Sequence, residues 1–185
     1  DDLATAAQAP QRAPSQVYRD LRAGAESGWD FSSRWMDDPS ALSSIQTTSI
    51  VPVDLNSLLY PLEQTIARAS RVAGDRASAR DYSARAEARR SAINRLLWDA
   101  AQGWYADHDL RSGQLRPALT AAALYPLWLK IATDEQARRS ADAAEAQLMR
   151  EGGLLTTTLV SGQQWDAPNG RSEERRVGKE CRSRW

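Results

Sequence analysis

The sequence is poor in several features that mark particular classes of protein. It has one cysteine, Cys181, among 185 residues, so no disulfide framework can be inferred. It has no run of about 18 apolar residues and no basic segment followed by an apolar stretch near its start, which leaves no predicted membrane span or signal peptide. Nor is one charge in excess, since 24 Lys and Arg balance 24 Asp and Glu. This balance gives no sign of a nucleic-acid or membrane partner.

The length sets a limit on the architecture. A chain of 185 residues can bury one sizeable core, because domains commonly run to roughly 100–200 residues. We therefore expect one domain or part of a larger one. The absence of a predicted signal peptide says nothing about export, since a chain that begins inside a longer protein would show none.

Apolar residues recur at helical spacing, which predicts an all-α fold. A short stripe predicts a helix over residues 16–26. A longer one predicts a helix over residues 54–73, with Asp54 as its N-cap and Pro61 as a kink or break. Its expected apolar face comprises Leu55, Leu58, Leu59, Leu62, Ile66, Ala69 and Ala73.

Further helices are expected downstream. Asp75 is placed to cap an amphipathic helix over about residues 76–98, and residues 119–131 are apolar nearly all round, which predicts a helix buried on most sides. Thr133 and Gln136 have capping-box spacing at the start of another amphipathic helix, expected to end at the next pair of glycines, Gly152 and Gly153. This alternation fits either a helical repeat array or a toroid of hairpins.

The richest cluster of chemical groups lies in residues 26–35, which hold two Trp, a Phe, an Arg and two carboxylates. Flat aromatic faces cover the C–H faces of a pyranose while carboxylates and Arg bind its hydroxyls. A glycosidase also needs a carboxylic acid in a setting of low polarity, and Asp30, between Trp29 and Phe31, is the natural candidate. The alternative is that Trp29 and Trp35 are core residues and Asp30 caps a turn.

A second cluster covers residues 162–170 and reads Gly-Gln-Gln-Trp-Asp-Ala-Pro-Asn-Gly. Its Pro and Asn-Gly predict a loop, and binding groups concentrate on loops. The alternative is an ordinary turn anchored by a Trp.

Both clusters resemble segments of the trehalase family. Residues 27–35, Ser-Gly-Trp-Asp-Phe-Ser-Ser-Arg-Trp, are similar to the segment that holds the general acid. Residues 164–170, Gln-Trp-Asp-Ala-Pro-Asn-Gly, are similar to the start of the second trehalase signature. Landmarks at 47–56, 103–107 and 152–154 follow the family's order and spacing, so the likeness covers about residues 16–170.

The resemblance implies a partial (α/α)6 barrel, with about half of the domain present, that hydrolyses α,α-trehalose to two glucose molecules with inversion. It implies no cofactor and no metal. Asp30 would be the catalytic acid, and a separate Glu would activate water from the far side, roughly 6.5–9.5 Å away. No residue here matches that Glu. The resemblance places these residues at the substrate: Gly28 through its backbone, Trp29, Gln164, Trp165 and Asp166.

The two ends of the chain depart from the family. The N-terminal signature is missing, and after Gly170 the sequence changes abruptly. Residues 171–185 could be a basic tail for an anionic partner, but they resemble the translation of a sequencing adapter. We interpret residues 1–170 as a fragment of the catalytic domain and residues 171–185 as a non-native tail. A fragment that exposes apolar faces is expected to be marginally stable and inactive.

Two other interpretations stay open at the level of sequence. One is another (α/α)6 glycosidase, such as a glucoamylase relative. The other is a noncatalytic helical-repeat binding module, which would not need residues 28–30 and Trp165 in one pocket. The full-length parent is expected to be periplasmic or secreted, with a cytoplasmic location left open. Oligomeric state is not predicted.

Overall fold

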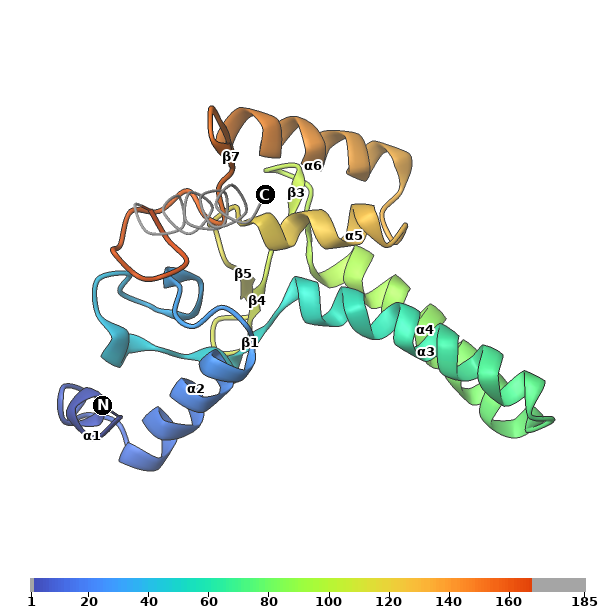
Figure 1. The fold of residues 1–185 in the computed structure, drawn as a ribbon, viewed down its shortest axis with the longest axis horizontal. Helices are drawn as coiled ribbons and strands as arrows, with labels where there is room; N and C mark the ends of the chain where they lie inside the picture. Colours follow the sequence, from blue (N-terminus) through green and yellow to red (C-terminus); the bar gives the residue numbers. More distant parts are fainter. Residues whose placement is uncertain (1, 168–185) are drawn as a thin grey trace, which may run out of the picture. The chain divides into compact units, whose positions relative to one another are not determined.

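The computed structural model describes residues 2–167 and divides the chain into two compact units (Figure 1). Unit 1 contains residues 1–50 and 147–185, and unit 2 contains residues 51–146. In the sequence, unit 2 is therefore inserted between the two segments of unit 1. The predicted boundary at residue 170 and the tail after it lie outside the described residues.

Unit 1 is built from short helices and loops. Its elements are α1 (Asp2–Ala7), α2 (Pro14–Glu26), the 3₁₀ turns η1 (Ser33–Trp35), η2 (Leu42–Ser44) and η3 (Thr47–Ser49), and the hairpin of β6 (Met149–Arg150) with β7 (Gly153–Leu154). In that hairpin, Met149 pairs with Leu154 and Arg150 with Gly153, antiparallel. Its core comprises Ala6, Ala9, Val17, Leu21, Trp35, Met36, Ile45 and Ile50. Helix α2 confirms the helix expected over residues 16–26 and begins two residues earlier, at Pro14.

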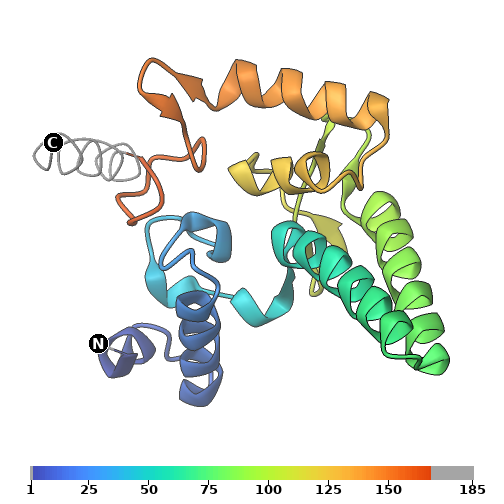
Figure 2. The ribbon, with the colours of Figure 1, turned by 45° about the vertical axis from the view of Figure 1, so that its right-hand side comes forward.

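Unit 2 centres on a helical hairpin. Its helices are α3 (Val53–Val72) and α4 (Arg76–Leu96), which lie side by side in both ribbon views (Figures 1 and 2). They are followed by η4 (Ala121–Leu124), α5 (Tyr125–Trp128) and α6 (Asp134–Gln147). Two antiparallel hairpins join them, β2 (Trp98–Asp99) with β3 (Trp104–Tyr105) and β4 (His108–Asp109) with β5 (Gln114–Leu115). The strand β1 (Ile50–Val51) lies at the boundary of the two units.

Two predicted helix caps are confirmed. The Asp75 carboxylate accepts hydrogen bonds from the backbone N–H groups of Ala77 and Ser78, at 3.1 and 3.0 Å, so it stabilises the start of α4. The Gln136 amide oxygen accepts from the Thr133 N–H at 3.0 Å, and the Thr133 hydroxyl accepts from the Gln136 N–H at 3.3 Å. That reciprocal pair is the capping box expected at the start of α6.

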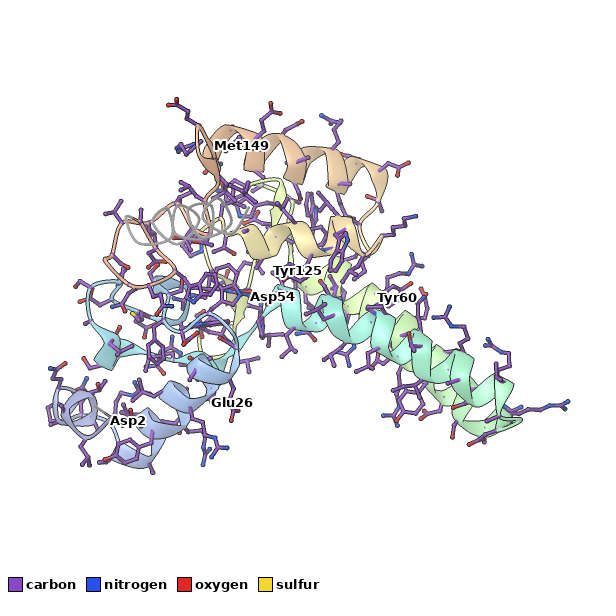
Figure 3. All side chains as sticks on the ribbon, viewed as in Figure 1. Asp2, Glu26, Asp54, Tyr60, Tyr125 and Met149 are labelled. Carbon is purple, nitrogen blue, oxygen red and sulfur yellow. The ribbon has the colours of Figure 1, made fainter. Side chains whose placement is uncertain are left out.

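The predicted N-cap of α3 is wrong. Pro52 occupies the cap position, and Asp54 lies inside the first turn (Figure 3). The Val53 N–H, which has no partner within the helix, donates instead to the Asp107 carboxylate at 2.9 Å. A residue distant in the sequence therefore caps this helix. Pro61 lies within α3, which continues through it, so the helix is not split there.

The apolar face expected for α3 is only partly buried. Leu55, Leu58 and Leu62 are 52%, 43% and 51% exposed, whereas Ser57 and Glu63 are buried. The three leucines are spaced three and four residues apart, so they lie on one side of the helix. We call them the leucine stripe. Periodicity identified this apolar side correctly, but the described residues leave about half of each of these leucines exposed.

The helix expected over residues 119–131 is wrong as a single element. Residues 121–124 form a 3₁₀ turn, and Pro126 lies in the first turn of a new, four-residue helix, α5. Lys130, at a φ of 56°, ends it. Trp128 is 70% exposed, but most of the segment is buried or half-buried, as the expectation of burial on most sides requires.

The predicted end of the last helix is wrong as well. Helix α6 ends at Gln147, and residues 149–154 form the β6–β7 hairpin. Gly153, with a φ of 128°, lies in this hairpin. Beyond helices, the described residues form only two-residue strands, as an all-α fold requires. Among residues 2–167, no helix combines the length and apolar character that a membrane crossing needs.

Candidate functional site

The structure brings the two predicted clusters together within unit 1. The backbone N–H of Trp165 donates to the backbone oxygen of Phe31 at 3.1 Å. The rings of Trp29 and Trp165 are in contact, with centroids 5.8 Å apart and planes tilted by 37°. Aromatic pairs favour such offset or tilted arrangements over face-to-face stacking. Two indoles from separate segments therefore form one aromatic surface.

The end of α2 determines how the first cluster leaves the helix. Helix α2 ends at Glu26 (Figure 3), and Gly28 follows in the left-handed region at a φ of 78°. Glycine adopts this conformation without a Cβ clash, which explains its place one residue after the C-cap. The Ser27 hydroxyl donates to the Gly24 oxygen at 2.6 Å and accepts from the Trp29 N–H at 3.1 Å. The turn thus directs Trp29 away from the helix.

Gly24 lets the same loop pack closely against α2. A Cβ at this position would lie 3.1 Å from the Phe31 ring and 3.1 Å from the Ile45 side chain. Phe31 is half-buried against the unit 1 core. Its close approach fixes the backbone immediately after Asp30.

A buried cation lies under the aromatic surface. The Arg34 guanidinium carbon is 4.7 Å from the centre of the Trp29 ring and 4.4 Å from that of Trp35, and the residue is 2% exposed. A planar guanidinium between two indoles combines stacking with cation–π attraction. The Trp35 indole N–H donates to the Trp29 backbone oxygen at 3.1 Å. Both contacts hold Trp29 in place.

Asp166 is the polar centre that joins the two clusters. Its carboxylate is fully buried and accepts hydrogen bonds from the Ser32 hydroxyl at 2.9 Å, the Ser33 N–H at 2.8 Å and the Thr157 hydroxyl at 3.0 Å. A fourth donor is the Ser161 hydroxyl. The hydroxyls of residues 157 and 161 belong to no motif, so sequence reasoning missed them. We call Asp166 and these four donors the Asp166 clamp.

The other predicted site residues differ in exposure. Asp30, Gly28 and Gln164 are exposed, and Trp29 and Trp165 are half-buried. Asp30 therefore lies at the surface of the loop that carries Trp29, and the setting of low polarity expected for it is not seen among the described residues. The structure brings the loops of these residues together, while substrate contact by each of them stays a prediction.

The described part of the chain shows no candidate metal site. Across residues 2–167 there is no group of three or more His, Cys, Asp and Glu side chains arranged to hold a metal ion. A cavity of about 570 Å³ lies in unit 2 and is lined by both apolar and charged side chains of α3, α4 and the segments beside them. None of the predicted site residues lines it.

Comparison with known proteins covers nearly the whole chain. A family profile for trehalase matches residues 1–175. The chain is 58% identical over 170 residues to periplasmic trehalases from Salmonella newport (strain SL254) and Salmonella paratyphi B, covering 92% of this chain and 30% of each relative. The chain thus spans about a third of the length of the curated relatives it matches.

Solved structures agree on the fold. Neutral trehalase Nth1 from Saccharomyces cerevisiae superposes with a TM-score of 0.68 at 27% identity, covering 83% of this chain and 30% of that one. A sialidase structure matches with a TM-score of 0.56 at 16% identity over 63% of this chain, which concerns the fold alone. The described helices are thus part of an (α/α)6 barrel, as expected from the sequence.

Proposed function

The chain belongs to the trehalase family, and on that premise we propose that its protein hydrolyses α,α-trehalose to two glucose molecules, with Asp30 as the general acid. One observation carries the proposal: Trp29 and Trp165 form a joint aromatic surface beside an exposed carboxylate. Aromatic faces next to a carboxylic acid are what a glycosidase needs to hold a pyranose and protonate its leaving oxygen.

The proposed mechanism is inverting. Asp30 would donate its proton to the glycosidic oxygen while a water molecule attacks the opposite face of the sugar, activated by a second carboxylate roughly 6.5–9.5 Å away. Exposure of Asp30 leaves its carboxyl group accessible to a substrate that stacks on Trp29. Gly28 and Gln164, also exposed, would contact the sugar from the same two loops.

The base is proposed to come from outside this chain. No residue of the sequence matches the Glu that the resemblance requires, and the chain spans 30% of its relatives. An acid without a base cannot complete an inverting displacement, so we expect the 185-residue chain alone to be inactive. Its relatives are named periplasmic trehalases, which supports a periplasmic location for the parent protein.

The contact between the two loops also bears on the alternatives. A noncatalytic helical-repeat module has no reason to hold Trp29 against Trp165, whereas a glycosidase does. Another (α/α)6 glycosidase would use a similar surface, and substrate profiling against maltose and other glucosides separates it from a trehalase.

A chimera tests the proposal directly. The 170 aligned residues would replace their counterparts in the Salmonella newport periplasmic trehalase, which supplies the rest of the protein. The chimera is expected to hydrolyse trehalose, and Asp30→Asn is expected to lower kcat by about 10²- to 10⁴-fold, the usual contribution of a general acid. Glu26→Gln is the matched control, because Glu26 is an exposed carboxylate near by whose partner is the exposed Arg22.

A second substrate checks the assigned role. Fluoride leaves α-glucosyl fluoride with little need of a proton, so Asp30→Asn should retain most of its activity on that compound. Full trehalose activity in Asp30→Asn would overturn the assignment of the acid. An inactive but folded chimera would overturn the proposed function.

A further inference from the structure

We propose that Asp166 is a positioning residue, which sets the placement of the general acid through its clamp and does not bind the sugar. This inference rests on the proposed function. It assigns Asp166 a different role from the sugar contact that the family resemblance suggests.

The Asp166 carboxylate has little capacity left for a ligand. Its two oxygens accept from four donors: Ser32 and Thr157 hydroxyls on Oδ1, and the Ser33 N–H and Ser161 hydroxyl on Oδ2. A carboxylate offers about four lone-pair sites, so these donors fill them. The residue is also 0% exposed. A sugar hydroxyl would have to displace a hydrogen bond that is already made.

The donors lie where they can control the acid. Ser32 and Ser33 are two and three residues after Asp30, and the Ser33 donor is its backbone N–H, so the carboxylate holds the main chain itself. Trp165, next to Asp166, donates its N–H to the Phe31 oxygen on the same short segment. Residues 31–33 are therefore fixed at three successive points from the 165–166 segment.

Such fixing matters to catalysis because general acids work only at short range. A displacement of about 1 Å at a reacting group can lower a rate by roughly 10²-fold. Hydrogen bonds to an ionised carboxylate are shorter and stronger than neutral ones, which suits a group that must hold a loop rigidly. Asp30 has no such network of its own, since it is exposed.

The test uses the chimera with Asp166→Asn. An amide replaces one accepting oxygen with an N–H₂ group, and the hydroxyls beside it must turn from donating to accepting, so the arrangement of four donors on one carboxylate is lost. We expect kcat on trehalose to fall about 10- to 100-fold with KM changed less than about threefold, because the aromatic surface remains. On α-glucosyl fluoride the loss should be less than about threefold, since the position of the acid matters little there.

Asp20→Asn is the matched control. Asp20 is another fully buried carboxylate of unit 1, and it accepts from Arg12, from the Thr48 N–H and from the Thr48 hydroxyl. It belongs to no proposed site. If Asp166 only stabilises the fold, both variants lose folded protein without selective loss on trehalose, and the proposal is overturned. If Asp166 binds sugar, KM rises on both substrates, which overturns it as well.

A milder variant covers the case in which Asp166→Asn does not fold. Thr157→Val removes one donor without placing an unpaired charge in the core, and it should show the same selective loss on a smaller scale. Equal activity of the Thr157→Val and parent chimeras on both substrates would then overturn the proposal. Failure of the proposed function is distinguishable, because it appears in the parent chimera or in Asp30→Asn and not in the Asp166 variants.

Discussion

The guanidinium of Arg34 lies between two indoles, 4.7 Å from the centre of Trp29 and 4.4 Å from that of Trp35. Through this contact Trp29 belongs to a packed stack. The same indole also contacts Trp165 in the proposed sugar-binding surface. Trp29 thus packs against the unit 1 core, as one of the two interpretations of the sequence expected, while its contact with a sugar stays a prediction.

Replacing Arg34 by Lys should weaken this stack. Lysine keeps the charge but has no planar group to lie flat between two rings, so we expect a loss of about 2 kcal/mol of unfolding free energy. Urea unfolding measures it. Arg22→Lys, at a side chain 81% exposed, is the control and should change nothing measurable. Equal stability of the two variants would show that the stack contributes little to the free energy of unfolding.

An ion pair between Arg89 and Glu63 connects α4 with α3. The Arg89 guanidinium donates to both Glu63 oxygens, at 2.9 and 2.7 Å, and to the Asn56 side-chain oxygen at 2.9 Å. Because Glu63 is buried, Arg89→Ala would leave the Glu63 carboxylate without a charged partner. We expect this to lower the free energy of unfolding, measured in urea, by about 3 kcal/mol. Arg85→Ala, which breaks an exposed pair with Asp81, is the control. A similar effect of both changes would show that burial of Glu63 is unimportant.

Acid should destabilise the β4–β5 region through Asp109. Hydrogen bonding from Arg111, at 2.6 Å, holds the pKa of Asp109 at about 2, below the usual 3.8. A carboxylate with a lowered folded pKa adds stability above its unfolded pKa, and this is lost as pH falls from about 4 to about 2. The contribution is on the order of 2 kcal/mol.

The measurement compares parent and Asp109→Asn chains by urea unfolding at about pH 5 and about pH 2.5, on either side of most of this titration. The variant should be less stable at the higher pH and should lose less stability on acidification. Parallel losses in the two chains would rule out this contribution of Asp109.

The leucine stripe should make the chain bind hydrophobic dyes. Leu55, Leu58 and Leu62 are about half exposed, and contiguous exposed apolar side chains favour association. Changing all three to Gln should lower dye fluorescence and raise the concentration at which the chain stays monomeric in sedimentation. Val72→Gln, at an exposed residue of α3 outside the stripe, is the control. Unchanged dye binding in the triple variant would show that the dye binds to another apolar surface.

Local features were the most predictable from sequence. Asp75, Thr133 and Gln136 act on backbone groups within three residues of themselves, so their capping required no knowledge of the rest of the fold. The cap of α3 was missed because Asp107 supplies it from far along the chain. Periodicity predicted the apolar side of α3 that holds the leucine stripe, but it could not predict how much of that side the rest of the fold covers.

In the candidate site, too, the short motifs were predictable from sequence and the long-range contacts were not. Asp30, Trp29 and Trp165 were identified because two short motifs carry them, and the structure brings those motifs into contact. Whether they bind trehalose stays a prediction. The burial of Asp166 and its four donors could not be foreseen, because hydroxyl residues such as Ser161 have no distinctive pattern until the loops meet.

The span of the Asp166 clamp affects the order of folding. Ser32 and Asp166 are 134 positions apart, and all of unit 2 lies between them in the sequence. A ribosome must therefore complete unit 2 before the two loops can meet, and joining such remote segments is entropically unfavourable until much else is ordered. The Asp166 clamp should accordingly be among the last parts to form, and a nascent chain that stops short of residue 166 cannot form it.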